Sequence, residues 1–282
     1  MSVNILTAIK NIATSPIGEL RSYYESRNRA NSMGEALENY IKDVFAGTLA
    51  EVDESKRLEK FEQIFSYQGN QNNPPDVIIR DGDAIEVKKI ESPLSQLALN
   101  SSYPKAKIYS DSPMITTACR NCESWVEKDI IYAVGVVNGS NLTKLFLVYG
   151  VDYAASAEIY ERIKSVISLG VNTIQDVEFA TTKELGRVNR VDPLGITYLR
   201  IRGMWGIENP AKVFSYVFTP TPNAEFDFAA IINSDKYDSF SSNDKAEIES
   251  LIGGNFAIAD IRIKTPDNPS ILRNAKLIKF HR

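Results

Sequence analysis

Apolar residues in the first quarter of the chain recur every three to four positions, which is the spacing of one face of an α-helix. The spacing predicts a first helix that begins at Ile5 and is ended by Pro16, and a second over 33–45 that Gly47 closes. A third helical pattern, rich in charges, covers 51–65. The apolar positions of the first two helices are Ile5, Ala8, Ile9, Ile12, Leu37, Tyr40, Ile41, Val44 and Phe45. These helices therefore have an apolar side to bury.

The pattern then changes to short apolar runs between turn residues, which indicates strands. The segment YQGNQNNPPD at 67–76 is expected to be a loop, because Gly, Asn and Pro disfavour regular structure. Two strands, 76–80 and 84–90, flank Asp81-Gly82-Asp83, a sequence typical of a hairpin turn. Further strands are expected at 129–137, 144–148, 196–202, 213–218, 226–232, 256–264 and 275–280, with helices at 155–169 and 244–252.

This order of elements predicts a mixed α/β (α+β) fold, in which helices lie on the faces of a mixed central sheet. The length of 282 residues suits one domain over 1–282. Within it, 1–150 would form the core with the helices and the hairpin. The β-rich remainder, 151–282, is left for recognition, dimerisation or both.

Composition narrows the chemistry. The single histidine, His281, is next to last, so Ser-His-Asp hydrolysis, histidine-held zinc and histidine general-base catalysis are excluded. Cys119 and Cys122 form one C-x-x-C, half of a structural zinc site, and are expected to be reduced thiols. Neither a signal-like N-terminus nor a membrane-length apolar run is present, so a cytoplasmic protein is expected. The chemistry must rest on carboxylates, lysine, cysteine or a metal held by oxygen.

The hairpin around Asp81 carries the most informative pattern. With a three-residue loop at 81–83, Arg80 would face Ala84 and Asp76 would face Lys88. The apolar residues Val77, Ile79, Ile85 and Val87 then share one face. Asp76, Glu86 and Lys88 share the other face with Ile78. Because a one-residue slip would mix the two sets, the hydrophobic pattern selects the register that clusters the charges.

This cluster has the groups that metal-assisted phosphodiester hydrolysis requires. Asp76 and Glu86 can bind Mg²⁺ through oxygen atoms. Lys88 can orient or deprotonate the attacking water, or stabilise charge on the phosphate. Glu38, at the edge of the apolar stripe on the second helix, can act as a third metal ligand or hold a metal-bound water. The alternative is a solvated hairpin face with an incidental ion pair, and an ordinary surface glutamate at position 38.

The order of a helix with Glu, then Pro-Asp, a hairpin and Glu-x-Lys resembles the PD-(D/E)xK nucleases. Asp76, Glu86 and Lys88 match that motif without departure. More narrowly, the chain is similar to the NgoPII-type type II restriction endonucleases. The segments that resemble this family are RNRANSMGEALENYIKDVFAG (27–47), PPDVIIRDGDAIEVKKIES (74–92), LALNSSYPK (97–105) and LRIRGMWGIENP (199–210).

The resemblance implies a restriction-endonuclease-like fold and Mg²⁺-dependent cleavage of double-stranded DNA at a short palindrome, with GGCC as the site. It also implies a homodimer, a 5′-phosphate product, and a cognate DNA methyltransferase as functional partner. The net charge of −4, from 32 basic and 36 acidic residues, disfavours loose binding to nucleic acid. Basic residues are nonetheless concentrated at 187–212 and 260–282.

Arginine reads guanine through two hydrogen bonds in the major groove. Arg200 and Arg202 alternate along an expected strand, so they would project from one face and are the leading base-reading candidates. Two solvated arginines on an outer sheet face are the alternative. The other candidate DNA contacts are Arg27, Arg29, Asn100, Ser101, Ser102 and Lys105.

Two other functions remain open. A repair or junction-resolving nuclease of the same fold would cut by DNA structure rather than by sequence. A DNA-binding protein with an inert acidic hairpin would not cut at all.

Overall fold

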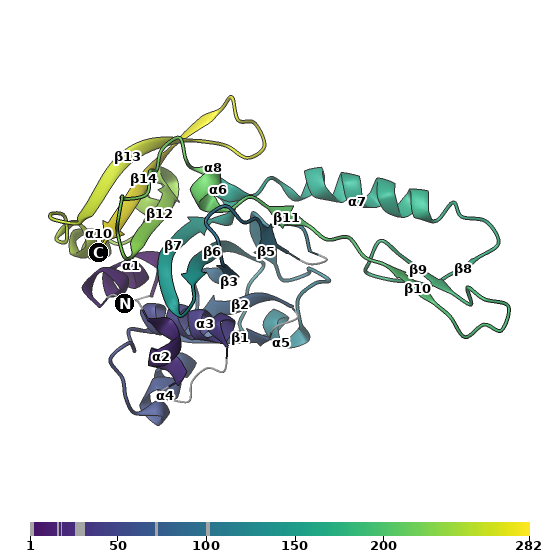
Figure 1. Cartoon of the computed structure of the whole chain (residues 1–282), viewed down its shortest axis with the longest axis horizontal. Helices are drawn as coiled ribbons and strands as arrows, with labels where there is room; N and C mark the ends of the chain where they lie inside the picture. The colour runs from purple at the N-terminus through teal and green to yellow at the C-terminus, as the bar shows by residue number, and fades with distance from the viewer. Residues whose placement is uncertain (1–2, 16, 18, 26–31, 71–72, 100–101) are drawn as a thin grey trace.

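A mixed β-sheet runs through the body of the protein (Figure 1). The computed structural model describes residues 3–15, 17, 19–25, 32–70, 73–99 and 102–282. Within these ranges the sheet has nine strands in the order β1-β2-β3-β6-β7-β12-β14-β13, and β5 pairs with β6. The strands are β1 (Phe65–Asn70), β2 (Asn73–Ile79), β3 (Ala84–Ile90), β5 (Lys107–Tyr109), β6 (Glu127–Asn138), β7 (Asn141–Tyr149), β12 (Asp227–Asn233), β13 (Phe256–Lys264) and β14 (Leu272–His281).

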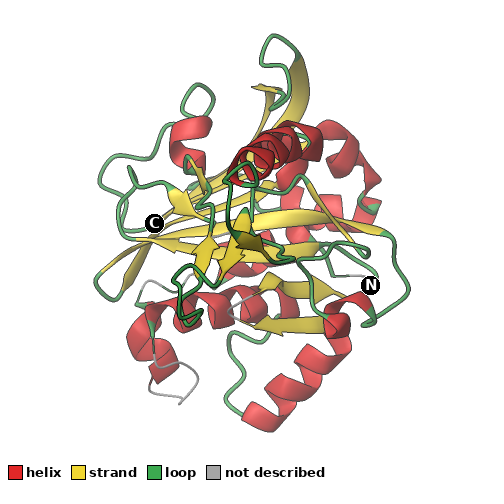
Figure 2. Cartoon of the chain, turned by 90° about the vertical axis from the view of Figure 1, so that its right-hand side faces the viewer, coloured by secondary structure: helices red, strands yellow, loops and turns green. Residues whose placement is uncertain are grey.

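Strand direction makes the sheet mixed, as the sequence predicts. The β3–β6 and β7–β12 pairs are parallel, and the other pairs of the sheet are antiparallel. The strand-rich C-terminal part completes this sheet through β12, β13 and β14. The predicted α/β class, with a mixed sheet between helices, is therefore confirmed (Figure 2).

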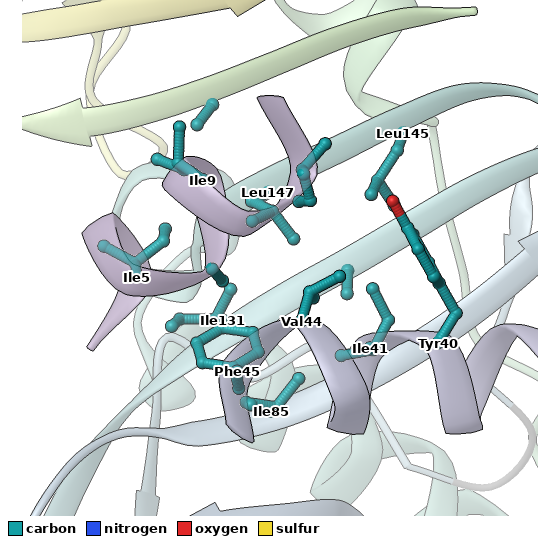
Figure 3. Close-up of a cluster of buried hydrophobic side chains, with 14 of the residues drawn as sticks. Ile5, Ile9, Tyr40, Ile41, Val44, Phe45, Ile85, Ile131, Leu145 and Leu147 are labelled. Carbon is teal, nitrogen blue, oxygen red and sulfur yellow. The ribbon is translucent and has the colours of Figure 1, made fainter. Parts of the chain in front are cut away.

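Helices cover one face of the sheet and bury its larger apolar cluster. The helices are α1 (Ile5–Thr14), α2 (Leu20–Glu25), α3 (Met33–Ala46), α4 (Glu54–Ile64), α9 (Ser234–Ser239) and α10 (Ser242–Glu249). The stripes predicted for α1 and α3 meet the strands there, with Ile9 and Phe45 beside Ile85 and Leu147 in the same cluster (Figure 3). Local signals set the limits of α3, since Ser32 caps its first turn and Gly47 ends it at a φ of 69°.

The opposite face buries a second apolar cluster under loops and short helices. The helices are α5 (Thr117–Arg120), α6 (Gly150–Tyr153) and α8 (Pro210–Val213). The described residues include no helix with both the length and the apolar character to cross a membrane.

A segment that we call the arm, residues 157–205, extends away from the body (Figure 1). It consists of α7 (Ala157–Val171) and a small sheet of β8 (Glu178–Phe179), β9 (Gly186–Asn189) and β10 (Leu199–Ile201). Beyond it, β11 (Gly206–Ile207) pairs with β4 (Leu97–Ala98) and returns the chain to the body. The amphipathic helix predicted for this region forms, yet none of the residues of α7 is buried.

Two predicted segments were wrong. The expected loop at 67–76 contributes to strands β1 and β2, because pairing between them supplies the backbone hydrogen bonds that the local sequence does not favour. The expected strand at 213–218 is instead the end of α8 and the turns that follow it. Asn209 caps that helix and Pro210 occupies its first turn, which favours helix over strand.

A buried ionic network joins the N-terminal helices. Asp43 on α3 is fully buried and accepts hydrogen bonds from Tyr24 at 2.7 Å and from Thr48 at 2.5 Å. It also pairs with the buried guanidinium of Arg57 on α4 at 2.7 Å. Because both charged groups are removed from water, each needs the other to offset its desolvation cost.

We expect Asp43→Ala to destabilise the protein by about 3–5 kcal/mol, because it leaves the Arg57 charge buried without its partner. Urea unfolding measures the change. The control is Glu247→Ala, which removes an ion pair with Lys10 whose side chains are 41% and 43% exposed. That loss should cost at most about 1 kcal/mol. Equal effects of the two substitutions would contradict the role given to Asp43.

Candidate active site

The β2–β3 hairpin carries the predicted charged residues. Val77 pairs with Ile85 and Ile78 with Ala84, so the next position brings Asp76 beside Glu86. Val77 and Ile85 lie in the cluster beneath the helices, while Ile78 and Ala84 lie in the opposite cluster. The predicted separation of apolar and charged faces is therefore present.

The exact pairing predicted for the hairpin was wrong by two residues. The loop is 80–82, and the amide of Ile79 donates to the carbonyl of Asp83 at 3.0 Å. Arg80 turns away to carbonyls at the end of α4, including that of Glu62 at 2.7 Å. Asp83 is buried, where Tyr149 and Lys236 each donate to it at 2.7 Å. A shift of two residues keeps every side chain on its face, which explains why the charges still cluster.

Asp76, Glu86 and Lys88 form a tight, largely desolvated group. The Lys88 ammonium donates to Glu86 Oε1 at 2.6 Å, and Asp76 Oδ2 accepts from the Val87 amide at 2.6 Å. Burial and the neighbouring Glu86 carboxylate raise the pKa of Asp76 to about 7, although Lys88 and the Val87 amide oppose the shift. Burial lowers the pKa of Lys88, but Glu86 and Asp76 outweigh it, so the net shift is upward.

Glu38 on α3 lies at the rim of this group. Its charge raises the pKa of both Asp76 and Lys88, after the larger effects of burial and the hairpin carboxylates. Its Oε1 accepts from Lys42, one turn further along α3, at 2.8 Å, and 30% of its side chain is exposed. The structure therefore brings Glu38 close to the hairpin charges, as an ion-paired carboxylate.

The donor atoms suit a hard cation. Glu86 Oε2 is buried and has no hydrogen-bond partner among the described residues, which is costly unless another group compensates it. Asp76 adds a second carboxylate in the same desolvated place. Among the residues that the structure describes, no three His, Cys, Asp or Glu side chains gather closely enough to hold a metal. Two carboxylates nevertheless fit Mg²⁺, which usually keeps several water ligands and takes few from the protein.

The candidate DNA-contacting residues that the structure describes lie in two regions, the loop before β5 and the arm. Lys105 lies near the hairpin, since Glu86 acts on its pKa. Ser102 is three residues before it in the same loop, where its amide donates to the Leu99 carbonyl at 3.2 Å. The remaining candidates of this loop and of the N-terminal third lie outside the described residues: Arg27, Arg29, Asn100 and Ser101.

Arg200 and Arg202 lie on the arm and point to the same carboxylate. Glu184 binds Arg200 at 2.6 Å and Arg202 at 2.9 Å. The three side chains line a hollow of about 280 Å³ that also includes Asn73, the first residue of β2. The predicted common face of the two arginines is thus present, and it lies toward the strand that carries Asp76.

Three residues around the site were not singled out from the sequence. Lys42 was recognisable, because it is four residues from Glu38 on one helix. Tyr132 is placed beside Glu86 by the parallel pairing of β3 with β6, which no local pattern encodes. Gly69 lies where β1 approaches β2 closely, and a Cβ there would be 2.4 Å from the Pro75 carbonyl oxygen.

A mixed sheet flanked by helices, with two carboxylates and a lysine on one hairpin, is consistent with a restriction-endonuclease-like fold. The family model for the NgoPII restriction endonuclease matches residues 3–264. The type II restriction enzyme NgoPII of Neisseria gonorrhoeae is 53% identical over 280 residues, covering 99% of this chain and 100% of the relative. No solved structure matches the chain.

The chain therefore belongs to the NgoPII restriction endonuclease family. The predicted class of enzyme, a type II site-specific deoxyribonuclease, is confirmed at this level.

We expect Gly69→Ala to lower both stability and cleavage, because its Cβ would force the backbone of Pro75 and Asp76 to move. Overpacking of this kind costs about 1–3 kcal/mol. A displacement near 1 Å at a reacting group can slow the reaction by about 100-fold. Urea unfolding and single-turnover cleavage measure the two effects.

The matched control is Gly170→Ala, since Gly170 is in α7 and has open space around it. It should leave cleavage unchanged. Wild-type cleavage by Gly69→Ala would show that β1 does not position Asp76.

Proposed function

We propose that this enzyme cleaves double-stranded DNA at a short palindrome, GGCC, in a reaction that requires Mg²⁺. It acts as a homodimer in the cytoplasm, as the nuclease of a restriction-modification system. A methyltransferase that protects the same site is its functional partner. The observation that carries the proposal is the buried Glu86 Oε2, which lies beside Asp76 and Lys88 on one hairpin face and accepts no hydrogen bond from any residue that the structure describes.

In this proposal Asp76 and Glu86 would hold Mg²⁺, which supplies Lewis-acid stabilisation of charge on the phosphoryl oxygens. Lys88 is held by Glu86 at 2.6 Å, so its ammonium is placed to donate to the attacking water or to a phosphate oxygen. Glu38 adds negative charge at the rim while Lys42 neutralises part of it. Water attacks phosphorus in line and leaves a 5′-phosphate and a 3′-hydroxyl.

The arm supplies the proposed base recognition. Arg200 and Arg202 present two guanidinium groups from one face, and arginine is the side chain best suited to guanine. In the free protein Glu184 holds both groups, which limits their attraction to phosphates in general. Because their hollow includes Asn73 of β2, base reading and cleavage can be coupled through that strand.

The arm also supports the proposed dimer. A palindrome presents two equivalent strands, and a two-fold pair of active sites matches that symmetry. The apolar side of α7 is exposed at Ile159, Ile163, Val166 and Ile167, so it is available to a second copy of the chain. A strictly monomeric enzyme in analytical ultracentrifugation, free and bound to DNA, would contradict the dimer.

The main test is plasmid digestion with sequencing of the cut ends. We expect discrete, reproducible fragments that end at GGCC, no cleavage in EDTA, and recovery on addition of Mg²⁺. Glu86→Gln should abolish cleavage and still bind DNA that contains the site, because only the metal-holding charge is lost. Its control is Glu91→Gln, which alters an exposed carboxylate immediately after β3 and should cleave normally.

Other outcomes of that digestion identify other functions. Cuts that follow DNA structure would indicate a repair or junction nuclease of the same fold. A folded protein that binds DNA and never cuts with Mg²⁺ or Mn²⁺ would disprove the enzymatic proposal.

We expect Arg200→Ala and Arg202→Ala each to weaken specific binding by about 1–3 kcal/mol, the discrimination that a good arginine–guanine pair provides. Binding to unrelated duplex should change less. The control is Arg190→Ala on the same arm, whose side chain is 74% exposed and pairs weakly with Glu178 at 3.6 Å. Fluorescence anisotropy on both duplexes measures the changes. An equal loss for both duplexes would identify the arginines as phosphate contacts.

A further inference from the structure

Lys105 is held next to the hairpin by its backbone. The Tyr132 hydroxyl accepts from the Lys105 amide at 2.7 Å and donates to its carbonyl at 3.2 Å. Tyr132 is itself buried and lies opposite Glu86 in the β3–β6 ladder. On the other side Gly150 allows close approach, since a Cβ there would be 2.4 Å from the Lys105 carbonyl oxygen. The residue is thus positioned relative to Glu86 by the sheet itself, although it belongs to a loop.

The ammonium of Lys105 has no carboxylate within ion-pair distance among the residues described. It lies 4.7 Å from the centre of the Tyr103 ring, and its side chain is half-buried. The other lysines of the site are matched, Lys88 by Glu86 at 2.6 Å and Lys42 by Glu38 at 2.8 Å. Desolvation and the nearby Lys164 lower the pKa of Lys105, against the opposing influence of Glu86 and Glu161. A partly desolvated cation therefore lies beside the site on a backbone that Tyr132 holds, and no acid among the described residues pairs with it.

The balance of charges at the site indicates a role for the Lys105 ammonium. The carboxylates of Asp76, Glu86 and Glu38 exceed the ammonium groups of Lys42 and Lys88 by one. One divalent cation and one phosphodiester would therefore bring the group to neutrality without Lys105. In-line attack by water, whose proton passes to bulk solvent, adds one negative charge around phosphorus. The 3′-oxygen takes a proton from solvent as its bond to phosphorus breaks. Lys105 is the available cation that can balance this additional charge.

We propose that Lys105 donates to an oxygen of the reacting phosphodiester and stabilises the negative charge that develops as the attacking oxygen bonds to phosphorus and the 3′-oxygen leaves. This inference rests on the proposed function and adds a catalytic residue to it. Since the interaction strengthens only as charge develops, it acts on the cleavage step more than on DNA binding.

The test compares Lys105→Met with wild type in two measurements on a duplex that contains the mapped cleavage site. Single-turnover cleavage with Mg²⁺ should slow by about 100- to 1000-fold, the usual effect of removing one donor to a developing oxyanion. The Kd for the intact duplex, with Ca²⁺ in place of Mg²⁺ and gel confirmation that it is uncut, should change less than about 10-fold. Lys105→Arg should restore part of the rate, because it returns the charge with altered geometry.

The matched control is Lys107→Met, two residues along the same segment. Lys107 is paired with Glu127 at 2.6 Å, so its loss should leave cleavage and binding unchanged. Near-wild-type cleavage by Lys105→Met would overturn the proposal. So would equal losses of rate and affinity, which would make Lys105 a ground-state phosphate contact, or equal losses in Lys107→Met, which would indicate disturbance of the segment.

The two proposals fail differently. If the wild type cleaves and folded Lys105→Met cleaves equally well, only the role of Lys105 is lost. If the wild type cleaves no DNA, the proposed function and this role fall together. If Lys105→Met does not fold, the Lys105→Arg variant is the test. A cleavage rate at or above that of wild type would contradict the proposed role of Lys105. A reduced cleavage rate with an unchanged Kd would support that role.

Discussion

The burial of one face of the β2–β3 hairpin beneath the helices is the constraint on which the site depends. Val77, Ile79 and Ile85 lie in the same buried cluster as Phe45 of α3. Because successive residues of a strand point to opposite faces, this burial obliges Asp76, Glu86 and Lys88 to share the other face. The charged group is therefore maintained by hydrophobic packing behind it, and the hairpin turn adds to that arrangement through Arg80 and Asp83.

Desolvation gives the group its chemical character. Asp76 is half-buried beside Glu86, and Glu86 Oε2 has no hydrogen-bond partner among the residues that the structure describes, so the site retains an uncompensated desolvation cost that a bound cation would offset. Lys105 lies close to Glu86, and no acid in the described part of the chain is within ion-pair distance of it. A site of this kind is costly in the free protein and complementary to a metal ion with a phosphodiester, which is consistent with the family to which the chain belongs.

The arm also presents surfaces that the protein does not bury in its own core. Its helix α7 exposes apolar side chains, and its small sheet presents Arg200 and Arg202 around Glu184. The body needs neither surface for its own core, because the two buried clusters are completed by the central sheet and the elements packed on it. The hollow that the arginines share with Asn73 links this surface to β2. In the proposed function, recognition and chemistry are thus assigned to different elements that meet at one strand.

Local spacing was sufficient for the longer helices α1, α3, α4, α7 and α10, for the two faces of the hairpin and for the resemblance that the family comparison confirms. The short helices α2, α5, α6, α8 and α9 were not predicted. Those features depend on which neighbouring residues share a face, and that information lies within a few positions of the chain. Even the error in the hairpin register left the faces intact, because it was a shift of two residues. The prediction of a loop at 67–76 was wrong because β1 and β2 are stabilised by pairing with each other, and not by the strand propensity of their residues.

Only the tertiary structure placed Tyr132 beside Glu86, Lys105 against Tyr132, and Glu38 near Asp76. It alone showed that α7 is left unburied and that Glu184 joins the two arginines. These relations connect residues that are distant in the chain, through the parallel β3–β6 ladder and the packing of α3 on the sheet. The sequence by itself determined which side chains could do the chemistry. The long-range burial of apolar surface decided which of them meet, and it placed Lys105 where no acid of the described residues pairs with it.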